Sequence, residues 1–143
     1  MPAYLALARG DSADARRRLE AVSDSLCLVA ACLPEKRLLA QLLSASGDDW
    51  RAAQVLDRWG RSGLPDDTPS AVLVELERGG MAERLGDTLR ARRAYGLVAD
   101  LWRNADPDLQ GYVGMAREGM GRVGGRAHRR TDGQADRLTQ VRP

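Results

Sequence analysis

Three Gly-Asp pairs constrain what this chain can fold into more than any other feature. They are Gly10-Asp11, Gly47-Asp48 and Gly86-Asp87, spaced 37 and 39 residues apart. Glycine readily takes the left-handed conformation that ends a helix. The polar residue that follows can cap the first N–H groups of the next helix, a role open to either Asp87 or Thr88 at the third pair. Each pair therefore predicts the tight turn of a helical hairpin.

The residues around the three pairs repeat as well. A small residue is needed where two helices of a hairpin cross closely, and a bulky one fills the gap a turn later. Five residues after the glycine stand Ala15, Ala52 and Ala91; nine after it stand Leu19, Leu56 and Tyr95; four before it stand Ala6, Leu43 and Ala82. Three copies in register indicate a structural repeat.

The composition favours helices over strands. The chain has 143 residues, of which 43% are hydrophobic, and it contains no Phe. Alanine and leucine dominate the apolar set and are strong helix formers, whereas β-branched runs are scarce. We therefore expect an all-α fold of antiparallel helix hairpins stacked as a short solenoid, as one domain or a short stack of units.

Apolar periodicity and capping residues give the predicted elements. The segment Ser23–Leu33 is left open, as a short buried helix or a packed loop. The helical repeat domain is predicted over residues 1–123, and residues 124–143 are predicted to form a disordered Arg/Gly-rich tail. The predicted helices are Ala3–Ala8, Ser12–Val22, Pro34–Ala45, Asp49–Trp59, Pro69–Arg84, Thr88–Asn104 and Pro107–Arg122.

Two details of packing can be predicted from the helices. Gly79-Gly80 inside a helix costs ~1 kcal/mol per glycine relative to alanine, which a close approach of two helices would explain. The three tryptophans, Trp50, Trp59 and Trp102, are expected to be buried rather than to form a ligand surface. In the third hairpin, apolar and small residues recur at helical spacing, at Leu85, Leu89, Ala91, Ala94, Tyr95, Val98 and Leu101.

No set of residues in the sequence has the composition and spacing of a known catalytic motif. Gly119-Met-Gly121-Arg-Val-Gly124 matches the letters of a dinucleotide-binding loop but follows a helix instead of a strand. His128 lies in the predicted tail, without rigid support for catalysis. Cys27 and Cys32 do not share a helical face at a spacing of five, so we expect free thiols and no zinc site. We therefore expect a non-enzyme with no cofactor and no metal.

Charge and hydropathy limit the kinds of partner that the chain is expected to bind. The longest apolar run, Leu26–Leu33, is far short of the ~20 residues that span a bilayer. No targeting signal is visible, so a cytoplasmic location without membrane contact is expected. The segment 121–143 carries a net charge of +4 and the remainder −2. The body is thus not a nucleic-acid footprint, and weak nucleic-acid binding through the tail is retained only as an alternative.

At this point the chain resembles the tetratricopeptide repeat family. The resemblance rests on Gly-Asp-x-x-x-Ala-x-x-x-(Leu/Tyr) at the three sites, together with Gly79 seven residues before Gly86. The segment from Glu77 to Val113 is similar to the C-terminal repeats of large bacterial Ser/Thr kinases and transcriptional regulators. The resemblance implies either a scaffold that binds another protein, or a regulatory sensor arm of such a larger protein.

The resemblance also implies a site. In this family the leading helices present a concave face to a peptide partner. An apolar edge at the N-terminal stub would favour self-association, or would mark where upstream repeats are missing. The residues implied to face the partner are Arg37, Gln41 and Ser44 in one repeat, and Leu76, Glu77, Gly80, Glu83 and Arg84 in the next.

Overall fold

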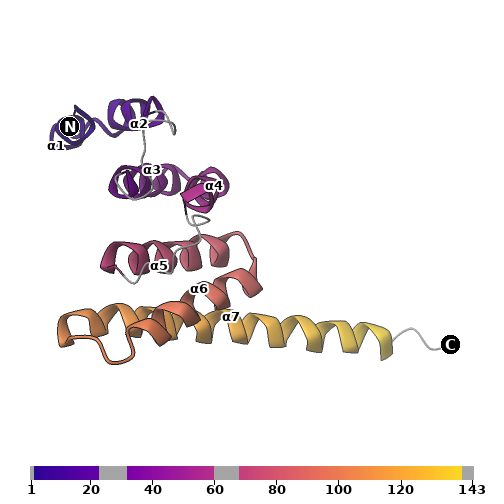
Figure 1. Cartoon of the computed structure of the whole chain (residues 1–143). Coiled ribbons are helices and arrows are strands. Elements are labelled where there is room, and N and C mark those ends of the chain that lie inside the picture. Colours follow the sequence, from indigo (N-terminus) through magenta and orange to yellow (C-terminus); the bar gives the residue numbers. More distant parts are fainter. Residues whose placement is uncertain (1, 23–31, 60–67, 140–143) are drawn as a thin grey trace. The chain divides into compact units, whose positions relative to one another are not determined.

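All regular structure in the described part of the chain is α-helical (Figure 1), which confirms the expected all-α class. The computed structural model describes residues 2–22, 32–59 and 68–139, with side chains over 3–22, 32–58 and 68–125. The chain divides into two compact units, Met1–Val74 and Glu75–Pro143. The boundary falls inside one helix, and each unit is described by itself.

Unit 1 holds the first two hairpins. Helix α1 (Pro2–Ala8) packs on α2 (Ser12–Glu20), α3 (Leu33–Ala45) packs on α4 (Asp49–Trp59), and α2 contacts α3. The core lies between these helices, and the most deeply buried side chains come from all four of them. They include Ala6, Ala15, Leu19, Leu39, Ala40, Leu43, Ala52 and Leu56.

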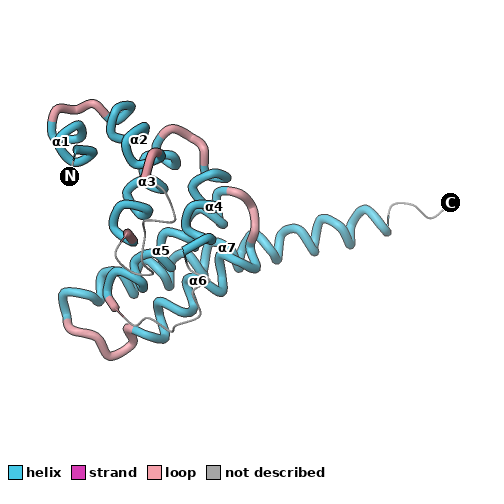
Figure 2. Tube along the Cα trace, turned by 45° about the horizontal axis from the view of Figure 1, so that its top comes forward, coloured by secondary structure: helices cyan, strands magenta, loops and turns pink. Residues whose placement is uncertain are grey.

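Unit 2 is built from three helices. Helix α5 (Pro69–Arg84) contributes its residues from Glu75 onward, and α6 (Thr88–Leu101) packs along α7 (Pro107–Thr139), as Figure 2 shows. The amide of Gln110 closes the α6–α7 connection by donating to the carbonyls of Trp102 and Ala105, at 3.3 and 2.8 Å. The buried side chains include Ala91, Tyr95, Val98, Trp102, Val113, Ala116 and Val123.

The three predicted turns are confirmed, and they share one construction. Gly10, Gly47 and Gly86 have φ of 79°, 86° and 78°. In each turn the aspartate N–H donates to the carbonyl of the residue four before the glycine, at 2.9 Å, and the glycine N–H donates one residue further on, as in a Schellman motif. The aspartate side chain then accepts the N–H three residues later. At the third turn the cap is therefore Asp87.

The repeated packing positions are also confirmed. The alanines five residues after each glycine are fully buried, and so are the large residues nine after it. The residues four before each glycine are buried too. The small and large positions thus fill the crossing of each hairpin in the same way three times.

The predicted burial of Trp50 is wrong. Trp50 is 62% exposed, because the buried face of α4 follows Ala52 and Leu56. In the third hairpin, Leu89 and Leu101 are exposed because the buried face of α6 follows Ala91, Tyr95 and Val98, and Leu85 is exposed in the turn between α5 and α6. Trp102 is buried as predicted, and the side chain of Trp59 lies outside the described residues.

Two helix ends differ from the prediction. Helix α6 ends at Leu101, before the predicted Asn104, and Trp102 caps it. Helix α7 runs past the predicted end at Arg122, so the predicted tail is helical as far as Thr139. The prediction ended the helix where the composition becomes rich in arginine and glycine. Each glycine costs only ~1 kcal/mol against alanine, and Val123 is fully buried between Gly121 and Gly124.

The expectation of free thiols is wrong for Cys32, which is disulfide-bonded. The spacing argument assumed one helix through both cysteines, whereas Cys32 is the residue before α3. Residues 23–31 lie outside the described part of the chain, and so does the choice between helix and loop for most of Ser23–Leu33. Among the helices that are described, none combines the length and apolar character needed to cross a bilayer.

Candidate functional site

The eight residues implied to face a partner lie on two helices. Arg37, Gln41 and Ser44 lie on α3 in unit 1, and Leu76, Glu77, Gly80, Glu83 and Arg84 lie on α5 in unit 2. Each set follows helical spacing, so its members occupy neighbouring positions along one helix.

The residues of the α3 set differ in exposure, and Ser44 makes a contact within its hairpin. Gln41 is exposed and Arg37 is half-buried. The Ser44 hydroxyl donates to the Asp49 carboxylate at 2.6 Å, which ties α3 to the first turn of α4. Ser44 therefore serves the hairpin, whereas Arg37 and Gln41 are four residues apart on the outer part of α3.

The ring of Tyr95 organises unit 2. A Cβ added to Gly79 on α5 would come within 2.6 Å of the ring, and one added to Gly119 on α7 within 2.4 Å. Both helices thus approach the ring as closely as glycine allows. This confirms the close approach predicted from Gly79. The contact with the ring also gives Gly119 a packing role. All three glycines of the rejected dinucleotide pattern lie inside α7, so they do not form a loop.

The Tyr95 hydroxyl emerges beside a buried carboxylate. Glu83 on α5 is 9% exposed, and it accepts the Tyr95 hydroxyl at 2.9 Å. Arg122 on α7 donates two parallel bonds to the same carboxylate, from Nε and Nη2 at 2.9 and 3.0 Å. This geometry is bidentate, which is the strong form of the arginine–carboxylate pair. Three helices therefore meet at one charge-assisted cluster.

The electrostatics of the Tyr95–Glu83–Arg122 cluster follow from burial and charge. Burial, together with the neighbouring Glu83 carboxylate, raises the pKa of Tyr95 above its usual value. The hydrogen bonds from Arg122 to Glu83 raise the pKa of the guanidinium further. These shifts favour the neutral phenol of Tyr95 and the charged guanidinium of Arg122 on either side of the Glu83 carboxylate. The Arg122 side chain remains 51% exposed, so the cluster opens to solvent on that side.

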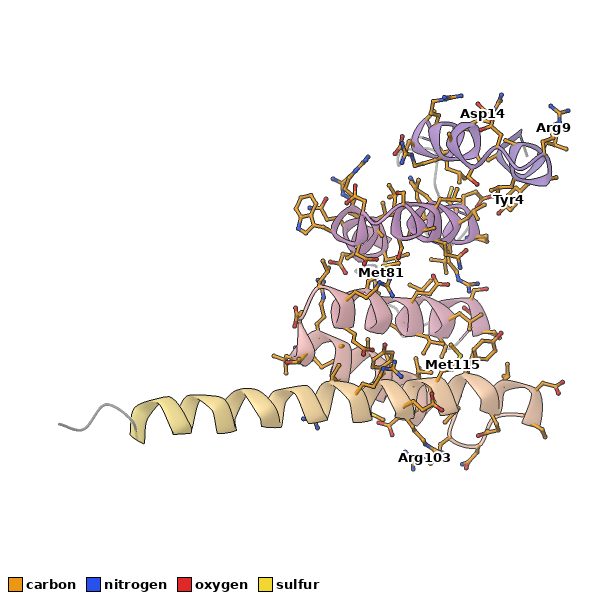
Figure 3. All side chains as sticks on the ribbon, turned by 180° about the vertical axis from the view of Figure 1, so that it is seen from behind. Tyr4, Arg9, Asp14, Met81, Arg103 and Met115 are labelled. Carbon is orange, nitrogen blue, oxygen red and sulfur yellow. The ribbon has the colours of Figure 1, made fainter. Side chains whose placement is uncertain are left out.

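Of the other α5 positions, Gly80 lies beside the Tyr95 hydroxyl and Arg84. Arg84 is exposed, and a Cβ at Gly80 would lie 3.4 Å from its Nη1 and 3.8 Å from the Tyr95 hydroxyl. Leu76 and Glu77 are half-buried one turn earlier. On α7, Met115 (labelled in Figure 3) is exposed. Unit 2 thus presents two exposed arginine side chains, Arg84 and Arg122, together with the exposed Met115.

Sequence reasoning missed the roles of Tyr95 and Arg122. The sequence pattern predicts only that Tyr95 fills the hairpin, and it indicates Arg122 only as the end of a helix. The pairs that define the cluster are 12 and 39 residues apart along the chain. Two features of the sequence could have indicated the role of Tyr95. A tyrosine stands where the other repeats have leucine, and a glycine, Gly79, stands where the second repeat has Ala40.

Glu83 is the predicted site residue whose placement differs most from the expectation. Its carboxylate accepts hydrogen bonds from Tyr95 and Arg122 inside unit 2, so it has a structural role in joining α5, α6 and α7. In the described side chains, no group of three or more histidine, cysteine or acidic residues could hold a metal ion.

Comparisons with known proteins leave this site to be interpreted from its own residues. No protein-family model, no curated protein and no solved structure matches the chain.

Proposed function

We propose that this chain is a cytoplasmic, non-catalytic helical-repeat scaffold of the tetratricopeptide type, whose hairpins stack as a short solenoid and bind a protein or peptide partner. The observation that carries the proposal is the threefold hairpin. The same left-handed glycine, the same 2.9 Å bond from the aspartate N–H and the same buried alanine recur at each turn. Repeats of this kind bury their apolar faces by stacking on their neighbours.

The binding surface would consist of the leading helices α3 and α5. Arg37 and Gln41 on α3, and Glu77, Gly80 and Arg84 on α5, provide mixed charge at helical spacing, which suits an extended peptide. Glu83 would hold Arg122 in place at the edge of this surface. Leu76 precedes Glu77 on α5 and would add apolar contact.

The test is recovery of partners by the immobilised full chain from a cell extract, quantified by mass spectrometry. Two double variants are compared, Arg37→Ala with Gln41→Ala, and Glu77→Ala with Arg84→Ala. The proposal expects each to lower recovery of a partner by about tenfold, since a few residues carry most of the energy of an interface. The control is Arg9→Ala, which lies on the exposed α1–α2 turn (Figure 3) and should recover the partner unchanged.

Equal recovery by the wild type and both double variants would remove the α3 and α5 surface from consideration. Circular dichroism of every variant separates this outcome from unfolding. Glu83 is left intact because its substitution would disturb the three-helix packing.

A further inference from the structure

The outer side of α6 carries large apolar groups that the fold does not use. Leu89, Leu97 and Leu101 are 65%, 44% and 47% exposed. Together with Arg93 they stand four residues apart, and side chains at this spacing are neighbours on a helix. We name Leu89, Arg93, Leu97 and Leu101 the outer stripe of α6. Its buried counterpart on the other side consists of Ala91, Ala94, Tyr95, Val98 and Ala99.

The charge beside this stripe is positive. Arg90, Arg92 and Arg93 are all exposed, and Arg92 lies next to Leu89 at a spacing of three. Neither Arg92 nor Arg93 forms a salt bridge with any residue whose side chain is described. The one acidic residue within α6, Asp100, is paired with Arg103 at 3.3 Å.

The corresponding face of the first repeat is different. At the positions of Leu89 and Leu97 it has the small residues Ala13, in α2, and Ala21, which caps α2. In the second repeat the position of Leu89 holds the exposed Trp50, but the position of Leu97 holds Arg58, so the row of exposed leucines is particular to α6. At the position of Arg90, α2 has Asp14, whose carboxylate accepts hydrogen bonds from two arginines of the same helix. The arginines of α2 thus pair with Asp14 and Glu20 of the same helix, whereas Arg92 and Arg93 of α6 have no such pair among the described side chains.

We propose that the outer stripe of α6 docks an acidic amphipathic helix of a partner protein. The stripe spans twelve residue steps, or about 18 Å of helix. A partner helix with apolar residues at the same spacing would cover the three leucines. Acidic residues beside that apolar row would meet Arg92 and Arg93, whose charge nothing else in the described chain offsets.

Charge also decides between the occupants. A second copy of this chain on the same stripe would bring its own Arg92 and Arg93 against these arginines, and like charges across an interface oppose binding. A helix that inserts into a lipid surface needs a broad apolar face, whereas here an arginine interrupts a row of three leucines. The proposal concerns a different helix from α3 and α5, so it stands or falls separately from the proposed function.

The test uses the full chain and two labelled synthetic helical peptides of about 20 residues, read by fluorescence anisotropy. One peptide has leucine along one face and glutamate on both flanks, and the other has lysine in place of every glutamate. The wild-type chain is expected to bind the acidic peptide at least about tenfold more tightly than the basic one. Leu89→Ala combined with Leu97→Ala is expected to weaken this binding about tenfold.

Reversal of charge sharpens the test. Arg92→Glu combined with Arg93→Glu should lose the acidic peptide and gain the basic one. Tyr4→Ala combined with Leu5→Ala, which removes exposed apolar groups from α1, should leave acidic-peptide binding unchanged. All substituted side chains are exposed, and circular dichroism checks each fold.

The proposal is overturned if the wild-type chain fails to bind the acidic peptide, binds both peptides equally, or keeps its preference after charge reversal. Vesicles of phosphatidylcholine and phosphatidylserine are measured in parallel. Binding to these vesicles without binding to the acidic peptide would assign the outer stripe to a lipid surface instead.

Discussion

The hairpins α3–α4 and α5–α6 share the same turn but fill the space behind it differently. Nine residues after the glycine, the α3–α4 hairpin has Leu56 and the α5–α6 hairpin has Tyr95, and both are buried. Seven residues before the glycine, the α3–α4 hairpin has the buried Ala40 and the α5–α6 hairpin has Gly79. A Cβ at Gly79 would reach the tyrosine ring, so the larger side chain requires the smaller neighbour. The backbone device is constant, and the side chains behind it vary as a pair.

A second pair of positions shows what this variation achieves. Ser44 in the α3–α4 hairpin donates to Asp49 within the same hairpin. Glu83, at the same position of the α5–α6 hairpin, accepts two hydrogen bonds from Arg122, which belongs to the following helix. The α3–α4 hairpin closes on itself at this point, whereas the α5–α6 hairpin is joined to α7. The turn builds the hairpin, and the residue three before its glycine decides which helix that position contacts.

The largest expected effect comes from adding one methyl group to α7. Gly119→Ala would place a Cβ within 2.4 Å of the Tyr95 ring, which Gly79 confines from the other side. We expect a loss of about 3 kcal/mol in the free energy of unfolding, the upper end for overpacking of a core. The measurement is a urea titration followed by circular dichroism.

The same helix supplies the control for this change. Gly111→Ala meets nothing within 4 Å, so it should stabilise α7 by up to ~1 kcal/mol through helix propensity alone. Combining Gly119→Ala with Tyr95→Leu, which copies the side chain of the first hairpin, should recover part of the loss. A Gly119→Ala chain as stable as the Gly111→Ala chain would show that the ring is not confined between the two glycines.

Two arginines with equal exposure should contribute differently to the free energy of unfolding. The side chains of Arg122 and Arg51 are both 51% exposed, but Arg122 binds a 10% exposed carboxylate, and Arg51 binds Glu20 of α2, which is 33% exposed. Arg122→Ala should cost about 2 kcal/mol, because it leaves a nearly buried charge with fewer hydrogen bonds. Arg51→Ala should cost less than ~1 kcal/mol, as is usual for an exposed pair. Equal losses in urea titrations would contradict the distinction between the two units.

The turns are where the hairpins should behave alike. Gly47 and Gly86 both have φ near +80° with open space around the missing Cβ, so the cost of Gly47→Ala or Gly86→Ala is purely conformational. Each should cost about 1 to 2 kcal/mol. Asparagine, which tolerates this conformation better, should cost less at both sites. Thermal unfolding followed by circular dichroism checks whether the two losses agree; a loss confined to one turn would show that the turns are not equivalent.

These contrasts also explain which parts of the structure the sequence predicts. The turns depend on residues within six positions of each other, so Gly86 and Asp87 carry enough information to place both helix ends. The exposure of Leu89 depends on which face of α6 meets α7, and leucine content alone does not specify that face. The site depends on Arg122 reaching Glu83 across 39 residues, and no local pattern encodes such a pairing. Cys32 was misjudged because its segment is not part of α3.

The smallest expected effect separates the tyrosine from the leucine it replaces. Tyr95→Phe keeps the ring between the two glycines but removes the hydrogen bond to Glu83, and it should cost about 1 kcal/mol at neutral pH. Because the folded protein raises the pKa of Tyr95 above the unfolded value of about 10, the neutral phenol stabilises the fold fully below that pH. This contribution is lost as pH rises through the folded pKa. Urea titrations at several pH values should therefore show the wild-type advantage over Tyr95→Phe shrinking above about pH 10. A difference that stays constant with pH would mean that ring packing alone, as with Leu56, accounts for the role of this position.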